Sequence, residues 1–244
     1  MERRVLRNAV LADGRRVDVV VVDGLVSEVD RAGSAPTAGV ADVVDLAGWL
    51  LIPSLCEPHA HLDKAHTAHK VPNPRGDLMG AIDAWVGAAE RGVFGLEEMT
   101  ERAVDALTRL VASGTTLVRT HVNVGESDPK FVHLRAVLEA KRRMSHVVDV
   151  QTVALMHSPL AGPEGAGNRR ALSGALELGV DLVGGCPHLE VDGRGMIDIA
   201  LRAAGEAGRS VDLHVDETLD PSMLTLLDLA RSEEHTSELQ SRQY

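Results

Sequence analysis

With 244 residues, 44% of them hydrophobic and 25% charged, the chain is large enough for a soluble globular protein with a sizeable core. Its net charge of −11 and its 2% of aromatic residues argue against a nucleic-acid-binding protein, which needs a basic surface or stacking platforms. No apolar run approaches the length of a membrane span, and the charged N-terminus is not followed by the apolar segment of a signal peptide.

The first part of the chain has the pattern of a small antiparallel sheet. Two runs rich in β-branched residues, 17–23 and 25–30, meet at Asp23-Gly24, a dipeptide that is typical of a tight hairpin turn. Gly, Ser, Pro and Thr then predict a loop over residues 32–41. We therefore predict a separate N-terminal β-domain.

From Leu51 onward, strand patterns alternate with helical patterns. Apolar and β-branched runs predict five strands, and glycines stop most of the helical segments between them. This alternation argues for a parallel sheet with right-handed crossovers, either a (β/α)₈ barrel or an open doubly wound sheet. The strands are expected at the run that starts with Leu51 and at residues 115–122, 147–155, 181–184 and 210–215, and the helices at residues 96–112, 130–144, 169–178, 196–207 and from about 220.

The first of these strands, expected to be buried, ends in His59-Ala60-His61. Side chains two residues apart on a strand point to the same face, so the two imidazoles would emerge side by side, with backbones roughly 6.5 Å apart. Neutral imidazole is a common ligand of zinc and iron, which makes the pair a candidate for part of a metal site. Taken alone, a His-X-His pair is equally well explained by two polar residues that merely end a strand.

A third histidine, His214, ends the fifth predicted strand, and Glu217 follows three residues later. In a (β/α)₈ barrel the carboxyl ends of the strands gather on one face, where active sites are assembled. Three histidines would supply the protein ligands of a catalytic metal and leave a position for water. We therefore favour the barrel and predict a metal site of His59, His61 and His214, with Glu217 moving the proton between water and a substrate nitrogen.

A closed barrel needs eight strands, and the repeating units stop near Ala230 after the fifth. Residues 231–244 change abruptly to polar residues, and residues 231–241 resemble a translated sequencing-library adaptor, so we expect a non-native tail. Residues 51–230 are then a partial barrel. Because a partial barrel leaves sheet edges and apolar helix faces uncovered, we expect the 244-residue chain to be inactive and poorly soluble.

A family resemblance is carried, in order along residues 1–230, by five segments: residues 53–64, 120–122, 150–154, 179–190 and 211–220. They resemble the amidohydrolase superfamily, specifically its cytosine deaminase-like branch. The resemblance implies a metal-dependent (β/α)₈ barrel flanked by a β-sandwich, of which residues 1–50 would be the N-terminal part. It assigns the metal to the three predicted histidines and the proton shuttle to Glu217.

The reaction implied by this resemblance is hydrolytic deamination of cytosine or a related nitrogen heterocycle, at a non-peptide C–N bond. One divalent ion, Fe²⁺ or Zn²⁺, would activate the attacking water. A single ion is implied because the fourth strand end, Leu182-Val-Gly-Gly, lacks the lysine that binuclear relatives use. Hydrolysis of N-substituted aminotriazines or cyclic amides is the alternative, and a non-catalytic metal-binding protein is the rival from another class.

Two departures from the family pattern affect the expected site. The Phe-Pro-Gln whose glutamine contacts the pyrimidine is replaced by Leu155-Met156-His157. His157 can still hydrogen-bond a substrate, but strict cytosine specificity is not implied. His188, in a rim segment of the family pattern, would contact substrate or form a rim hydrogen bond. The histidine of the sixth strand and the metal-binding aspartate of the eighth have no counterpart in this chain.

Other residues near the predicted site receive simpler interpretations. His121 is expected to support the ligands rather than bind metal, Lys64 to pair with Asp63 on the surface, and Cys56 to be a buried inert thiol. Two isolated cysteines make no disulfide framework, which favours a reduced, cytoplasmic setting. The expected partner is a small nitrogen heterocycle, neither nucleic acid nor membrane, and a homo-oligomer is left open.

Overall fold

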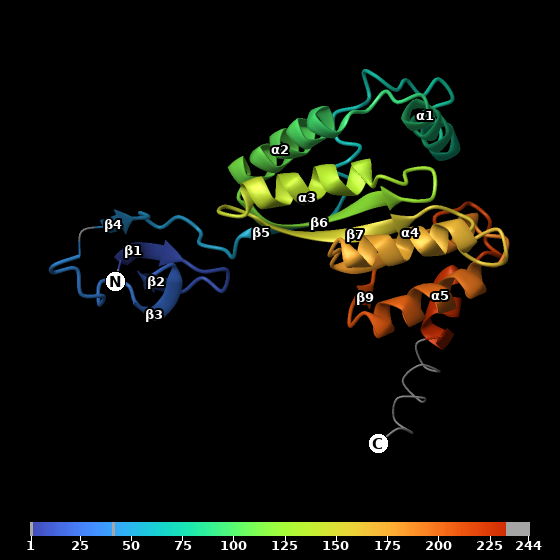
Figure 1. Cartoon of the computed structure of the whole chain (residues 1–244). Coiled ribbons are helices and arrows are strands. Elements are labelled where there is room, and N and C mark those ends of the chain that lie inside the picture. The colour runs from blue at the N-terminus through green and yellow to red at the C-terminus, as the bar shows by residue number, and fades with distance from the viewer. Residues whose placement is uncertain (1, 41, 233–244) are drawn as a thin grey trace. The chain divides into compact units, whose positions relative to one another are not determined.

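The structure is a computed structural model that describes residues 2–40 and 42–232, so most of the tail predicted to be non-native lies outside the described residues. The chain divides into two compact units, Met1–Ser54 and Leu55–Tyr244 (Figure 1). Within the described ranges, no helix is long and apolar enough to cross a membrane. Each unit is considered separately below.

The first unit is a four-stranded sheet in the order β3-β2-β1-β4. β2 pairs antiparallel with both β1 and β3, and β4 joins β1 in parallel. The predicted hairpin turn is confirmed, because Asp23 and Gly24 take positive φ angles of 49° and 82°, as a tight β-hairpin turn requires. The strands are β1 Arg3–Val10, β2 Arg16–Val22, β3 Leu25–Arg31 and β4 Asp42–Asp45.

Buried residues lie on both faces of this sheet. Val5 and Val20 form one small cluster with Ala35, and Ala9, Val17 and Val19 form another. The described residues of this unit make a single sheet, without the second sheet that a sandwich requires. The predicted β-sandwich therefore stays a prediction.

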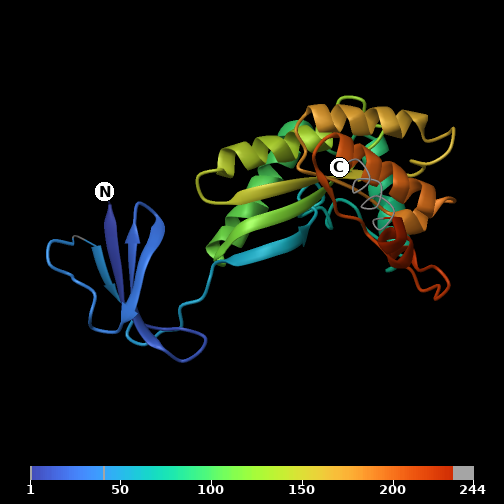
Figure 2. The ribbon, with the colours of Figure 1, turned by 90° about the horizontal axis from the view of Figure 1, so that it is seen from below.

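The second unit is built on five parallel strands in the order β5-β6-β7-β8-β9. Four helices pack their apolar faces on one side of this sheet and form the main buried cluster with it (Figures 1 and 2). The strands are β5 Leu55–Ala60, β6 Thr115–Val124, β7 Asp149–Met156, β8 Leu182–Gly185 and β9 Ser210–Val211, and the packed helices are α2 Leu96–Ala112, α3 Val132–Met144, α4 Ala166–Glu177 and α5 Gly193–Glu206.

The sheet is strongly curled. β5 and β9 are its two outer strands, which in a flat sheet would lie about 19 Å apart. Yet His61 after β5 and His214 after β9 bring their Nε2 atoms to 3.4 Å from each other. Only a sheet that curls toward its own concave side allows this contact, so the five βα units form about half of a barrel, as expected from the sequence.

The apolar run that begins at Leu51 is not one buried strand, contrary to prediction. Leu50 bridges Val10, and the Leu51 N–H donates to the Val10 carbonyl at 2.8 Å, so these residues belong to the first unit. β5 begins only at Leu55, beyond Pro53, and Leu55 is 48% exposed because β5 is an outer strand. The run is thus divided between two units.

Three further segments complete the second unit. Helix α1, Leu78–Glu90, is not among the helices expected from the sequence, and the short 3₁₀ helix η1, Pro187–Leu189, follows β8. Residues 225–232 are helical at the end of the described chain, in agreement with the helix expected from about 220.

Candidate metal centre and adjoining pocket

Alternation along the strands separates core residues from site residues. On β6, Val118, Val122 and Val124 are buried against the helices. The residues between them, Arg119 and His121, therefore point to the concave face of the curled sheet. The same alternation places His59 on β5 and His214 after β9 on this face, because their neighbours Ala60 and Leu213 pack against the buried cluster. The carboxyl ends of the strands are the position at which barrel enzymes assemble their sites.

Four histidines converge at the carboxyl ends of the strands. The ring centroid of His121 lies 4.4 Å from that of His214 and 4.6 Å from that of His59, and His59 and His214 are 4.8 Å apart. His61 joins them at 5.2 to 5.5 Å. One ligand atom from each of His59, His121 and His214 can be chosen so that all three lie within 4.8 Å of one another, a spacing that could hold a metal ion.

The chemistry of these imidazoles suits a metal. Burial, reinforced by the nearby Lys64 ammonium, lowers the pKa of His61 to about 3. Burial and the neighbouring His214 lower the pKa of His121 to about 3, and burial followed by His59 lowers the pKa of His214. The three rings are therefore neutral at pH 7, which is the form that binds metal.

Several ring nitrogens in this cluster are also unpaired. Both nitrogens of His121 and the Nδ1 of His214 are buried without a hydrogen-bond partner among the described residues. Buried polar atoms of a native protein are nearly always paired, so orphan nitrogens at one point indicate a missing partner. A cation that accepts an imidazole lone pair would satisfy one nitrogen of each ring.

An ion pair lies one layer below the histidines. The Arg119 guanidinium contacts the Asp212 carboxylate at 2.8 Å, and Arg119 Nε donates to Gln151 Oε1 at 2.9 Å. The second carboxylate oxygen of Asp212 lies 3.6 Å from His121 Nε2. The pair joins β6, β7 and the segment after β9 across the concave face, which fixes the strand ends that carry His121 and His214.

Lys64 and Asp63 do not form the surface pair that the sequence suggested. Asp63 is fully buried, and although burial raises its pKa, Lys64 and His133 together lower the pKa to about 2. The Lys64 ammonium lies 3.7 Å from Asp63 Oδ1, donates to Asn123 Oδ1 at 2.7 Å and approaches His61 Nδ1 at 3.2 Å. A fixed cation therefore lies beside the histidine cluster.

The proton-shuttle candidate Glu217 lies at the rim. Its side chain is 43% exposed, and its Oε2 is 3.9 Å from Nε2 of His188, whose side chain is only 3% exposed. His188 Nδ1 contacts the backbone carbonyl of His214 at 3.2 Å, so η1 is connected to the segment that carries the metal candidate. Glu217 and His188 thus lie together beside His214, as neighbours rather than isolated rim residues.

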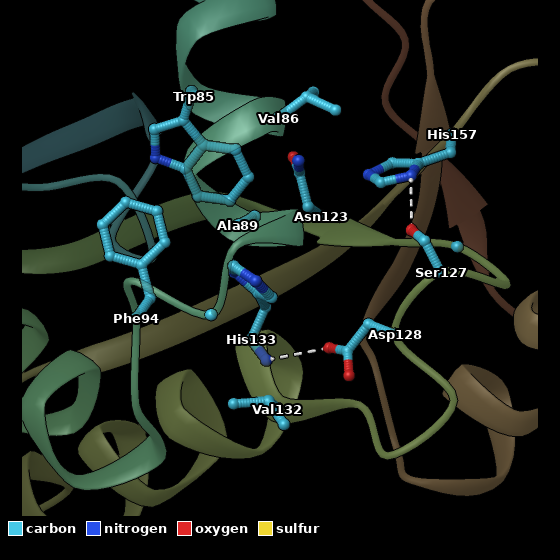
Figure 3. Close-up of a pocket in the computed structure, with 12 residues that line it drawn as sticks. Trp85, Val86, Ala89, Phe94, Asn123, Ser127, Asp128, Val132, His133 and His157 are labelled. Atoms are coloured by element: carbon cyan, nitrogen blue, oxygen red, sulfur yellow. Dashed lines mark hydrogen bonds between the residues drawn. The ribbon is translucent and has the colours of Figure 1, made fainter. Parts of the chain in front are cut away.

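His157 lies in a cavity of about 220 Å³ next to the histidine cluster (Figure 3). Burial and the Lys64 charge lower its pKa, its Nδ1 is 3.5 Å from Ser127 Oγ, and its buried Nε2 has no hydrogen-bond partner within the described part of the chain. The cavity was not predicted, because its walls come from α1, the start of α3 and the loop after β6, which no sequence motif connects.

The two cysteines differ in environment. Cys56 is exposed, contrary to the buried thiol that was predicted, because β5 is an outer strand. Cys186 is partly buried, and burial, with Glu217 nearby, raises the pKa of its thiol to about 11. The raised pKa of Cys186 is the opposite of the lowered pKa of a reactive thiol nucleophile.

A half-barrel of βα units with a histidine cluster at the carboxyl ends of its strands defines a barrel-type protein with a candidate metal centre. No family model matches the chain. It is 32% identical over 216 residues to a pterin deaminase of Rhizobium rhizogenes. The aligned residues make up 88% of this chain and 48% of that relative. The chain spans about half the length of the curated relatives it matches.

Solved structures agree in fold. A 5-methylcytosine deaminase from Klebsiella pneumoniae is 31% identical, with a TM-score of 0.82 over 93% of this chain and 55% of that one. An N-isopropylammelide isopropylaminohydrolase from Burkholderia multivorans is 26% identical, with a TM-score of 0.79 over 99% of this chain and 59% of that one. The chain belongs to the amidohydrolase superfamily, in its cytosine deaminase-like branch.

Proposed function

We propose that the full-length protein is a metal-dependent hydrolase that releases ammonia or an amine from a nitrogen heterocycle. The observation that carries this proposal is the cluster of histidines, drawn from three different strand ends, in which three ring nitrogens are buried and have no hydrogen-bond partner among the described residues. The similarity to a pterin deaminase, a 5-methylcytosine deaminase and an N-isopropylammelide isopropylaminohydrolase supports the substrate class.

The metal would be one divalent ion, Fe²⁺ or Zn²⁺, held by His59, His61 and His214. An all-nitrogen donor set suits either ion. His121 is a fourth candidate, because its two nitrogens are orphaned and it lies closer to His59 and His214 than His61 does. When bound, the ion supplies a water molecule that is activated for attack at neutral pH.

The side chains around the cluster would position and protonate the substrate. Glu217 is the proposed proton carrier, since a carboxylate at the rim can take a proton from water and deliver it to a ring nitrogen. His188, 3.9 Å away, would hold Glu217 toward the site and contact the substrate. His157 would hydrogen-bond the substrate through its unpaired Nε2.

Metal content tests the ligand assignment, and turnover separates this proposal from the non-catalytic rival. We expect His214→Ala to reduce bound divalent metal from one ion per chain to almost none, measured by elemental analysis after dialysis. The matched control is His146→Ala, which removes an exposed histidine that lies before β7, at the opposite end of that strand. Unchanged metal content in His214→Ala would contradict the ligand assignment.

Turnover is tested with Glu217→Gln in the full-length protein. We expect this variant to retain its metal and to lose at least a hundredfold in kcat, because general acid–base catalysis contributes about 10²–10⁴-fold. Assays with cytosine and with an N-alkylaminotriazine, scored for ammonia and for alkylamine, distinguish deamination from the alternative reaction. Bound metal without release of either product would favour a non-catalytic metal-binding protein.

A further inference from the structure

The cavity beside the histidine cluster contributes only His157 to the function proposed above, and its other walls have no role there. It measures about 220 Å³ and is lined by residues from α1, the end of β6, the loop after it and the start of α3. Its aromatic wall is Trp85, 7% exposed, which stacks on Phe94 with ring centroids 5.4 Å apart and also contacts the ring of His133 at 5.0 Å. The neighbouring rings thus hold Trp85 in place and leave it as the flat part of the wall.

The cavity lies next to the candidate metal centre. Asn123 lines it and lies two residues beyond His121 on the same face of β6, which places the two Cα atoms roughly 7 Å apart. Lys64 contacts both sites, because its ammonium lies 3.2 Å from His61 Nδ1 and 2.7 Å from Asn123 Oδ1. A planar molecule whose reacting carbon lies over the histidines would therefore extend into the cavity.

Polar atoms in the cavity indicate the chemistry of its occupant. Figure 3 shows the His157 ring and the six-membered ring of Trp85 both directed toward Asn123. His157 Nε2 is buried and unpaired among the described residues, and the Lys64 ammonium lies 5.0 Å from the Trp85 ring centroid. An occupant with a flat face and hydrogen-bonding edge atoms would satisfy these groups, whereas an alkyl group would leave them unpaired.

We propose that this cavity holds the second ring of a fused bicyclic nitrogen heterocycle whose first ring lies over the histidine cluster. The proposal rests on the function proposed above and specifies its substrate class. Substrates of a single ring would leave the cavity empty, and N-alkylated rings would place an apolar group against His157. Trp85, Asn123 and His157 would then determine specificity, while the histidines and Glu217 carry out the reaction.

The first test fills the cavity. Ala89 lines it on α1, and Ala89→Phe would occupy the space of the second ring. In the full-length protein we expect the ratio of kcat/KM for pterin to that for cytosine to fall at least tenfold. Ala81→Phe, at an exposed position of the same helix, is the matched control and should leave the ratio unchanged. An unchanged ratio in Ala89→Phe, with its unfolding midpoint preserved, would overturn the proposal.

A binding measurement makes the test independent of turnover. Pterin fluorescence titrations on metal-free protein should show Kd raised about tenfold by Ala89→Phe and about fivefold by His157→Phe, which keeps the ring but removes its hydrogen-bonding nitrogens. Tighter binding of N-isopropylammelide to His157→Phe would show an alkyl occupant and refute the bicyclic assignment. Pterin binding that depends on Ala89, without any hydrolysis, would contradict the proposed function and leave this inference standing.

Discussion

At the scale of single residues, the sequence predicted the site through motifs and missed residues that only the fold brings in. His59-Ala-His61 and His214 were identifiable because each follows an apolar run in the sequence. His121 was assigned a supporting role, although the alternation of Arg119, His121 and Asn123 inside an apolar strand was a signal that this strand has a polar face. Asp63 and Lys64 could not be placed, because burial of the turn after β5 depends on contacts with β6 and α3.

Asp18 is a buried carboxylate that should stabilise the first unit. It is fully buried within the valine-rich strand β2, and it accepts backbone N–H groups from Asn8, Gly33 and Ala35 at 3.0, 2.9 and 3.3 Å. Burial raises its pKa, but these three hydrogen bonds outweigh burial and lower the pKa below its ordinary value. We expect Asp18→Ala to destabilise this unit by about 3 kcal/mol, because it leaves buried N–H groups unpaired.

The pH dependence of that loss has a definite sign. A carboxyl with a lowered folded-state pKa contributes stability that is fully present above its unfolded-state pKa of about 3.9 and is lost as pH falls through the folded-state pKa. Urea unfolding should therefore show the wild type losing stability below about pH 4 more steeply than Asp18→Ala. Parallel curves for the two proteins between pH 6 and pH 2 would show that Asp18 contributes no such linkage.

At the scale of elements, glycine positions predicted where helices end. The apolar runs were a poorer guide to the length of the strands. Gly114, Gly179 and Gly208 follow α2, α4 and α5 with positive φ angles of 89°, 91° and 64°, the conformation that stops a helix. The predicted strand 210–215 is regular only over Ser210–Val211, although Asp212 and His214 N–H groups still donate to the β8 segment at 2.9 Å. Backbone irregularity of this kind depends on the partner strand, which the local sequence does not encode.

Helix α1 was not predicted, although its N-cap residue was a signal for it in the sequence. Its N-cap is Asp77, whose carboxylate accepts from the Gly80 N–H at 2.6 Å. The cap follows a loop with Pro and Gly and precedes a helix with few charges, so no strong amphipathic pattern marked it. An aspartate before an apolar stretch is nevertheless a helix N-cap signal that the sequence contains. It would have predicted α1, which forms one wall of the cavity.

Close strand packing at Gly184 yields a prediction for β8. A Cβ there would meet the Asp212 carbonyl oxygen at 2.8 Å and Val153 Cγ1 at 2.6 Å. We expect Gly184→Ala to destabilise the second unit by about 2 kcal/mol through overpacking, and to weaken metal binding by displacing the segment that carries His214. Thermal unfolding and metal titration measure the two effects.

The control lies on the next helix. Gly205 in α5 is exposed and has free space around an added Cβ, so Gly205→Ala should stabilise the same unit by about 0.5–1 kcal/mol without changing metal affinity. A loss at Gly184 together with a gain at Gly205 would tie the loss at Gly184 to its close neighbours. A Gly184→Ala variant as stable as wild type would show that β8 and β9 adjust freely.

At the scale of the whole chain, the two units differ in what a metal ion should do to them. All four clustered histidines belong to the second unit, and the first unit contains no histidine. A ligand that binds only folded protein stabilises by RT ln(1 + [L]/Kd), about 2.7 kcal/mol at one hundred times Kd. Zinc should therefore raise the stability of the second unit and leave the first unchanged.

Tryptophan fluorescence can report the units separately, because the chain has two tryptophans, Trp49 in the first unit and Trp85 in the second. In Trp49→Phe, the buried Trp85 becomes the only indole reporter, and we expect zinc to shift its urea midpoint upward. In Trp85→Phe, the Trp49 signal should not move. Adding His214→Ala to Trp49→Phe should abolish the shift, whereas adding His146→Ala should preserve it. A zinc-dependent shift that survives His214→Ala would place the ion elsewhere than at the strand ends of the half-barrel.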